Sequence, residues 1–425
     1  MKVIYMVSEY FGPDNEIGAI RFTKIAKYLS RKGHQVIVFT KNKKRTLVDQ
    51  ILLDDTNEIK HHGGTIYAVE AETTRMFDHF MAVTGLFCED VKNVEKMMYC
   101  GRKFARRHWM HILKQDLPKP DVILTTYGDW GGHYLGMKLK KKYGIQVKWI
   151  ADFRDPMKGI GKTNALLTKC RERYEDTVIK KADVITVIAD EMKEHVCNKH
   201  NATVYVIKNG FDTEDIERIS GDVFEGTKKF HMVYTGTLYT GSKKKYDLIP
   251  FFTALSELVQ SNRVMAEDLC LHYAGKHFEE FKRQLGENCK GVEVVNHSFV
   301  DRKTALLLQK DANVLLLASW NTKEDKGQVT GKIFEYFMMK KPVIALVSGD
   351  EPKSVVKKMI TGADCGFCYE ESTGAEDSRN MKEYFCTVYD AWKSGQTFDF
   401  QIREDYVGQF EYYNIANVFE NIMNQ

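Results

Sequence analysis

The stretch Thr330-Gly-Lys-Ile-Phe-Glu335-Tyr-Phe-Met-Met-Lys-Lys-Pro342-Val-Ile-Ala345 decides the fold class of this chain. It predicts a loop, a helix of about eight residues, a short turn and a buried strand. The same alternation of short β-branched strands and amphipathic helices recurs along most of the sequence. That alternation is typical of parallel sheets whose two faces are covered by helices. We therefore predict an α/β protein.

Along the whole chain, the predicted strands form two groups, here called blocks. In the first block we expect strands at 2–7, 35–40, 121–125, 147–151, 184–188 and 203–207, before a turn at Asn209-Gly210. The segment 213–229 is polar and has no apolar rhythm, so we interpret it as a linker. The pattern restarts at His231, with strands expected at 269–274, 292–295, 313–318 and 342–347. Two doubly wound domains follow, at 1–212 and 230–400, with a final helix within 401–425.

Composition narrows the class of protein. The chain has 425 residues, 62 Lys and Arg against 58 Asp and Glu, and a net charge of +4, which argues against a dedicated nucleic-acid binder. No apolar run approaches the roughly 20 residues of a membrane-spanning helix. The first ten residues lack the pattern of a signal peptide. Nine cysteines, an odd number, favour a reducing compartment over a disulfide framework. We therefore expect a cytoplasmic protein.

The pair Cys365 and Cys368 forms an isolated C-x-x-C motif. A tetrahedral metal site would need further ligands, and no second pair accompanies this one. We predict two small buried thiols.

Two glycine-bearing loops follow predicted strands. The first ends in Gly18 at a helix start, where backbone N–H groups can face an anion or a sugar hydroxyl. The alternative is a plain helix entry in which the glycine relieves strain. The second begins at Gly236 and nearly matches a phosphate-binding loop, but it reads Gly-Ser-Lys where that loop needs Gly-Lys-Ser/Thr. Its three lysines could still cradle a diphosphate, or they could be a solvated run of charge. They are Lys243, Lys244 and Lys245.

Lys332 and Glu335 are three residues apart, so they share one face of the predicted helix. Glu335 lies between aromatic residues, where an unpaired carboxylate would be costly. The carboxylate should therefore accept hydrogen bonds, and a vicinal diol is a suitable pair of donors. An internal ion pair between Lys332 and Glu335 is the alternative.

These residues resemble the GT-B-fold, family 4-type retaining glycosyltransferases. In that family, a K-x-x-E helix followed by a turn and a P-V-I-A strand forms the nucleotide-sugar site. Other segments of this chain match the family in the same order. They are the Gly18 loop, Ala151 to Pro156, Ala182 to Thr186, Ile207 to Asp212, Tyr234 to Leu238, and Lys326-Gly327.

The resemblance implies two Rossmann-like domains facing across a cleft, with the acceptor side at 1–212, the nucleotide-sugar side at 230–400, and the C-terminal helix packing back on the N-terminal domain. It implies that Glu335 holds the ribose hydroxyls and that the preceding loop approaches the diphosphate and the sugar. The expected donor-binding residues are Gly18, Gly236, Lys243, Lys244, Lys245, Gly327, Thr330, Gly331, Lys332 and Glu335.

The sequence departs from the family at two positions. Many relatives carry another Glu eight residues before the one that corresponds to Glu335. This chain has Gly327 at that position, so we expect loop N–H groups at 327–331 to hold the donor sugar. Many relatives also have a His-Asp pair where this chain has Arg154-Asp155. His133, at the start of a predicted helix, is a candidate to supply an imidazole, although a lone histidine is more often a surface or capping residue.

Asp152 and Arg154 follow a predicted strand, and strand ends face the ligand in this fold class. A salt bridge within the loop is the alternative to a site role. We take Arg154, Asp152 and His133 as the candidate catalytic residues, with Arg154 or Asp152 contacting donor phosphate or sugar hydroxyls.

Function follows from the resemblance. It implies transfer of a sugar, with retention, from a nucleotide-sugar to a saccharide or polyprenyl-diphosphate-linked acceptor, in cell-surface polysaccharide synthesis. No D-x-D pair ends an apolar strand, so we expect neither a metal ion nor a cofactor beyond the nucleotide-sugar, and no nucleic-acid partner. The alternatives are a nucleotide-sugar 2-epimerase on the same scaffold and a non-catalytic binding protein.

Residues 96–114 contain six Lys or Arg and no acid. At helical spacing, Met97, Phe104, Ala105, Trp109 and Ile112 share one side, and Arg102, Lys103, Arg106, Arg107 and Lys114 share the other. This pattern predicts a basic amphipathic helix. It would serve either as ordinary packing or as a contact to an anionic surface at the inner face of the plasma membrane, where a lipid-linked acceptor would lie.

Overall fold

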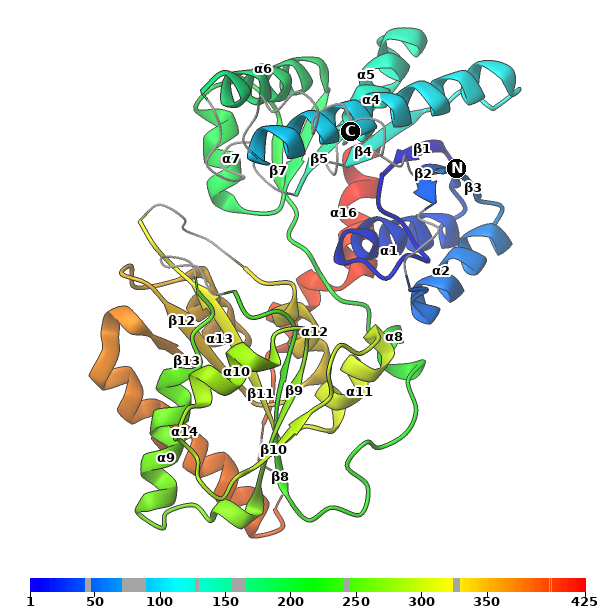
Figure 1. Cartoon of the computed structure of the whole chain (residues 1–425). Helices are drawn as coiled ribbons and strands as arrows, with labels where there is room; N and C mark the ends of the chain where they lie inside the picture. The colour runs from blue at the N-terminus through cyan, green and yellow to red at the C-terminus, as the bar shows by residue number, and fades with distance from the viewer. Residues whose placement is uncertain are drawn as a thin grey trace. The chain divides into compact units, whose positions relative to one another are not determined.

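The chain divides into two compact units (Figure 1). Residues 1–209 and 412–425 form the first, here the N-terminal domain, and residues 210–411 form the second, the C-terminal domain. The computed structural model describes residues 1–42, 47–70, 89–126, 130–154, 165–239, 245–323, 329–396, 398 and 400–425, with the backbone alone at 89–98 and 165–167.

The N-terminal domain is built on a parallel sheet of seven strands in the order β3-β2-β1-β4-β5-β6-β7. Its strands are β1 Val3–Val7, β2 Gln35–Asn42, β3 Thr65–Glu70, β4 Val122–Thr126, β5 Lys148–Phe153, β6 Val184–Val187 and β7 Val204–Val206. Its helices are α1 Ile17–Arg31, α2 Gln50–His61, α4 Glu89–Lys114, α5 Gly131–Tyr143, α6 Ala165–Lys181, α7 Asp190–Cys197 and α16 Tyr412–Asn424.

Helices cover both faces of this sheet because side chains alternate along each strand. On one face, residues such as Tyr5 and Trp149 pack with α4, α5 and α6. On the other face, residues such as Met6 and Ile150 pack with α1 and α16. The predicted return of the C-terminal helix to the N-terminal domain is therefore confirmed.

The C-terminal domain has a parallel sheet of six strands in the order β10-β9-β8-β11-β12-β13. Its strands are β8 Phe230–Thr235, β9 Leu269–Ala274, β10 Glu293–Asn296, β11 Val314–Trp320, β12 Val343–Ser348 and β13 Gly366–Glu370. Its helices are α8 Glu214–Glu217, α9 Ile249–Gln260, α10 Phe278–Leu285, α11 Arg302–Asp311, α12 Lys332–Met339, α13 Val355–Ala363, α14 Gly374–Lys393 and α15 Glu404–Val407. Two parallel-sheet domains confirm the predicted fold class.

The segment 213–229 differs from the prediction of a linker. It belongs to the C-terminal domain, and its apolar residues Ile219 and Phe224 are buried there. Asp215 of α8 pairs with Arg302 at 2.8 Å, and the Val223 N–H donates to Asp311. The polar composition of the segment hid these contacts, because they depend on partners far away in the sequence.

The two cysteines of the C-x-x-C motif are buried as predicted, at Cys365 and on β13 at Cys368. Burial raises the pKa of both thiols far above the usual value. Among the described residues, no helix is both long and apolar enough to cross a bilayer.

Candidate functional site

The most informative predicted residue, Glu335, lies on α12 beside the carboxyl end of the C-terminal sheet. Its side chain is 16% exposed, so one edge of the carboxylate can reach a ligand. Oε2 accepts from Lys332 Nζ at 2.8 Å and from Gln309 Nε2 at 2.9 Å. The internal pair with Lys332, which was the alternative to a ligand contact, is therefore present.

Gln309 of α11 fixes the carboxylate against the sheet. Its amide nitrogen also donates to Thr235 Oγ1 at 2.9 Å, and the side chain is fully buried. Gln309 thus joins the end of β8 to Glu335. The sequence analysis missed this residue, because a Gln in a helix carries no signal until α11 and α12 are seen side by side.

The charge of Glu335 follows from its neighbours. Burial raises the pKa of the carboxyl, but the positive charges of Lys332 and Arg302 and the hydrogen bonds from Lys332 and Gln309 outweigh it. The net result is a pKa below the usual value. Glu335 is therefore an ionised acceptor at neutral pH, suited to neutral donors such as hydroxyl groups.

Gly236 lies next to the start of the same helix. Its φ of +121° is strained for other residues, and a Cβ there would come within 3.6 Å of Lys332 Cε. The loop after β8 and the first turn of α12 are thus adjacent. This arrangement gathers a cation and the N-terminal end of an eight-residue helix, and both favour phosphate oxygens.

Thr330 and Gly331 precede α12. Thr330 Oγ1 accepts from the Lys332 N–H at 3.3 Å. A Cβ on Gly331 would meet no described atom within 4 Å, so this exposed backbone is open to approach.

Three aromatic rings meet near the carboxyl ends of β8 and β11. Tyr246 lies 5.0 Å from Tyr239 and 5.2 Å from Trp320, measured between ring centroids. Tyr246 and Trp320 are buried, whereas Tyr239 is 51% exposed. This group was not predicted, because Trp320 lies far from the two tyrosines in the chain.

Of the three predicted phosphate-binding lysines, Lys245 is described. Its Nζ lies 2.6 Å from Asp247 Oδ2, a hydrogen bond that raises the pKa of the lysine. The side chain is 42% exposed and so remains within reach of solvent. Lys243, Lys244 and Gly327 lie outside the described residues.

A second group of predicted residues comes together in the N-terminal domain. Arg154 donates to the Gly18 carbonyl at 2.7 Å, so the end of β5 is tied to the start of α1. A Cβ on Gly18 would lie 3.2 Å from the Tyr10 ring and 3.4 Å from the Arg154 guanidinium. Close packing of these two side chains therefore accounts for the glycine.

Asp152 is fully buried at the end of β5, with hydrogen bonds to both carboxylate oxygens. It pairs with Arg21 at 3.1 Å and accepts from Thr126 and Thr186. Arg21 also donates to the carbonyl of Ile207 at 2.9 Å. With an exposure of 0%, Asp152 thus holds its strand in place through bonds within the domain, and its contact with donor phosphate or hydroxyls stays a prediction.

His133 is buried in the first turn of α5. Its Nδ1 lies 2.8 Å from Thr125 Oγ1, and its ring lies 4.8 Å from that of Phe153. Burial lowers the pKa of the imidazole to about 3, although the Asp152 charge raises it slightly. His133 is therefore a neutral side chain at physiological pH.

Glu9 is a further buried residue of this group. Its Oε1 accepts from the Gly131 N–H at 2.6 Å, and its other oxygen pairs with Lys41. The carboxylate thus stabilises the N-terminus of the helix that carries His133. A glutamate one residue after Ser8, in a glycine-bearing loop, gave no such signal in the sequence.

Comparison with known proteins fits this geometry. Residues 19–215, just under half of the chain, match the family model described as Glycosyltransferase Family 4. A comparison with curated proteins finds no match.

Solved structures resemble the whole chain. The N-terminal domain of a Candida albicans trehalose-6-phosphate phosphatase superposes with a TM-score of 0.60 at 10% identity, covering 100% of this chain and 97% of that chain. An α,α-trehalose 6-phosphate synthase from Burkholderia multivorans gives 0.57 at 10% identity, covering 100% and 96%. A candidate UDP-N-acetylglucosamine 2-epimerase from Listeria monocytogenes gives 0.50 at 12% identity, covering 99% and 95%.

At these identities the likeness shows the fold and leaves the activity open. The resemblance expected from the sequence is therefore confirmed: the chain has the GT-B fold, and its residues 19–215 resemble glycosyltransferase family 4.

Proposed function

We propose that this protein is a retaining glycosyltransferase that moves a sugar from a nucleotide-sugar to a saccharide or lipid-linked acceptor. The observation that carries the proposal is the partly exposed Glu335 carboxylate, oriented by Gln309 and Lys332 beside the N-terminus of α12. An ionised carboxylate in this setting suits the two hydroxyls of a ribose, as the family resemblance implies. The family model match at 19–215 supports the same class of enzyme.

In this proposal the chain's own groups stabilise the leaving diphosphate. We propose that Lys332 and the N–H groups at the start of α12 and after Gly236 stabilise the negative charge that develops on the diphosphate. Lys243, Lys244 and Lys245 are further candidates for this role, and Gly327, Thr330 and Gly331 would line the sugar and diphosphate. We propose that no divalent metal is required, because these cations and N–H groups can serve the same purpose.

On the acceptor side, we propose that Arg154 contacts substrate, while Asp152 and His133 act as positioning residues. Asp152 holds the end of β5 through Arg21, and His133 packs against Phe153. A neutral, buried imidazole suits a positioning role better than proton transfer.

The exposed arginines of α4 extend the proposal to the membrane surface. Arg102, Arg106 and Arg107 are exposed, while Phe104 and Ile112 on the opposite side are buried in the domain core. The predicted two-sided pattern is thus present for the residues whose side chains are described. We propose that the basic side meets anionic lipid and brings the enzyme to a lipid-linked acceptor used in cell-surface polysaccharide synthesis.

A thermal-shift panel of nucleoside diphosphates and nucleotide-sugars tests the proposal, because a bound ligand raises the melting temperature by mass action. Stabilisation by one nucleoside diphosphate and by its sugar conjugate is the expected result. If no nucleotide changes the melting temperature, the result would support a non-catalytic binding protein. The presence of Gly327 where many relatives have Glu also favours that alternative.

A second candidate function is nucleotide-sugar 2-epimerisation, because a candidate UDP-N-acetylglucosamine 2-epimerase shares this fold. Incubation with UDP-N-acetylglucosamine alone separates the two, because an epimerase needs no acceptor. Conversion to the 2-epimer would replace the transferase proposal.

A further inference from the structure

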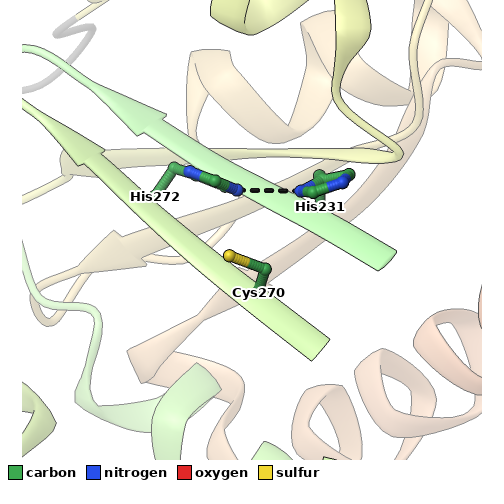
Figure 2. Close-up of side chains that lie close together, drawn as sticks. All are labelled: His231, Cys270 and His272. Carbon is green, nitrogen blue, oxygen red and sulfur yellow. Dashed lines mark hydrogen bonds between the residues drawn. The ribbon is translucent and has the colours of Figure 1, made fainter. Parts of the chain in front are cut away.

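Two histidines and a cysteine meet in the C-terminal domain, away from the Glu335 site. His231 lies on β8, and Cys270 and His272 lie on the neighbouring strand β9 (Figure 2). In the sheet register, His231 pairs with Cys270 and Val233 pairs with His272, so the three side chains share one face. Each residue offers one atom that could bind a metal, a ring nitrogen or the sulfur, and these three atoms lie within 4.8 Å of one another.

The cluster is enclosed. His231 is 6% exposed, Cys270 2% and His272 4%. The Phe224 ring covers it, with its centroid 3.9 Å from that of His231 and 4.5 Å from that of His272. Three polar groups in such a setting need partners, because a buried polar group without one is costly.

His231 also has a hydrogen-bond partner on the side away from His272, and this partner determines which ring nitrogen carries no proton. Thr227 Oγ1 donates to the Phe224 carbonyl at 2.7 Å, so its oxygen is left to accept. His231 Nε2 lies 2.7 Å from that oxygen and must therefore carry the hydrogen. In the neutral imidazole, Nδ1 then presents a lone pair toward His272.

His272 has a similar outer partner. Its Nδ1 lies 3.0 Å from His297 Nε2, while its Nε2 lies 2.9 Å from His231 Nδ1. Each ring therefore turns one nitrogen inward and holds the other on a neighbouring polar atom. This is the arrangement by which proteins orient histidines that bind a metal ion.

We propose that His231 Nδ1, His272 Nε2 and Cys270 Sγ bind one zinc ion. A tetrahedral zinc ion with Zn–N near 2.0–2.1 Å and Zn–S near 2.3 Å holds its ligand atoms about 3.3–3.6 Å apart. The inward nitrogens, now 2.9 Å apart, need to separate by only a few tenths of an ångström. Imidazole with thiolate is a donor set that suits zinc, and the fourth position is left for water.

The ion would link β8 and β9, and through Thr227 it would hold the segment that carries Phe224. His231 stands at the amino end of β8, whereas Thr235 and Gly236, which belong to the Glu335 site, stand at its carboxyl end. The proposed zinc site is therefore separate from the donor site and does not depend on the proposed function.

Cobalt(II) titration of the chelator-treated full-length protein tests the proposal. One equivalent should produce the near-ultraviolet charge-transfer band of a thiolate bound to cobalt, and zinc should displace it. Zinc should also raise the melting temperature of the metal-free chain. A wild-type chain that gives no thiolate band and no zinc-dependent shift would show that the cluster is a hydrogen-bonded histidine chain without metal.

Variants identify the ligands. Cys270→Ser should abolish the band, whereas Cys289→Ser should keep it, because Cys289 is equally buried but bonds to the Phe252 carbonyl. His297→Gln should weaken zinc binding about 10- to 100-fold, the usual cost of losing an outer partner. A band that survives in folded Cys270→Ser would overturn the proposal. If that variant does not fold, the His297→Gln affinity decides, and an unchanged value overturns it.

Discussion

Lys332 Nζ lies 2.8 Å from Glu335 Oε2, one turn apart on α12 and without any ligand between them. The ion pair keeps the carboxylate charged and directs it before a substrate arrives, so little reorganisation is needed on binding. Removing either partner therefore changes the charge around the other.

Glu335→Ala should weaken nucleotide binding by about 1.5–3 kcal/mol, the usual value for a hydrogen bond to a charged group, or roughly 10- to 150-fold in Kd. Calorimetric titration with the nucleoside diphosphate found by thermal shift measures the change. Glu383→Ala, an exposed glutamate on α14, is the control and should bind normally. Unchanged affinity in a folded Glu335→Ala protein would remove Glu335 from the site.

Gln309→Leu should lower both stability and nucleotide affinity. The substitution deletes the donor to Thr235 and Glu335 while keeping the side chain's approximate volume. A buried acceptor that loses its partner costs about 1–3 kcal/mol, seen as a lower melting temperature. The loss of affinity should be smaller than in Glu335→Ala, because Lys332 still orients the carboxylate. An affinity equal to wild type would show that Gln309 serves packing alone.

Stability should fall below pH 6.5 because two histidines of the N-terminal domain are buried and neutral. Burial lowers the pKa of His133 to about 3 and that of His108 to about 4. The unfolded chain, with an ordinary histidine pKa near 6.5, binds the protons first. Each group's contribution is therefore complete above pH 6.5 and is lost as pH falls, by about 1.4 kcal/mol per pH unit.

Melting temperatures at pH 7 and pH 5 check this slope. His108→Gln should flatten it, because glutamine can still donate to the Thr40 carbonyl that His108 Nε2 faces at 3.0 Å but does not titrate. His61→Gln, an exposed histidine at the end of α2, should leave the slope unchanged. Equal slopes in all three proteins would contradict the role of the buried imidazole.

Sugar transfer should continue in excess EDTA, because Lys332 and backbone N–H groups replace a divalent ion at the diphosphate. Initial rates with and without EDTA, magnesium and manganese provide the measurement. Cys270→Ser should respond in the same way, since the proposed zinc site is separate from the donor site. Loss of activity that magnesium or manganese restores in both proteins would reveal a catalytic metal.

The protein should co-sediment with anionic vesicles at low salt and dissociate at high salt, because salt screens charge over a Debye length. Each basic residue near the surface contributes about 1 kcal/mol. Replacing Arg102, Lys103, Arg106 and Arg107 by Gln should therefore abolish binding. The control replaces four exposed lysines of the C-terminal domain, Lys282, Lys290, Lys340 and Lys393, and should still bind.

The outcome of this experiment also tests the packing of α4. Arg107 donates to the Glu70 carbonyl and Arg102 to Tyr134 Oη, at 2.8 and 3.3 Å, so a modest drop in melting temperature is expected. If the wild-type protein does not bind anionic vesicles, α4 serves only to pack against the rest of its domain.

The sequence predicted the fold well where local pattern and burial agree. The apolar run at 314–318 and the β-branched run at 203–207 each formed parallel strands. The strand β13 was missed, since Gly366 and the polar end of the run weaken its pattern. Local pattern also failed at 213–229, where burial of Phe224 depends on β8 and β9.

The residues of the candidate sites also differ in whether the sequence predicted them. Glu335 and Lys332 were predicted, because a charged residue between aromatics on one short helix is conspicuous in sequence. The partner of Asp152 was not, since Arg21 lies 131 positions earlier and meets it only through the order of strands in the sheet. Gln309 and Glu9 were not predicted for the same reason.

The position of α16 has a consequence for how the chain is made. Its residues Ile415 and Phe419 pack into the same core as Phe22 and Ile25 of α1, although the whole C-terminal domain lies between them in the sequence. The C-terminal domain, in contrast, is a single continuous segment that ends at Glu411. During translation, the N-terminal domain can complete its core only after the C-terminal domain has been synthesised, which reverses the usual order of domain folding. Until then, the apolar face of α1 that α16 covers is exposed. A nascent chain stalled before residue 412 would therefore present apolar surface to which chaperones bind.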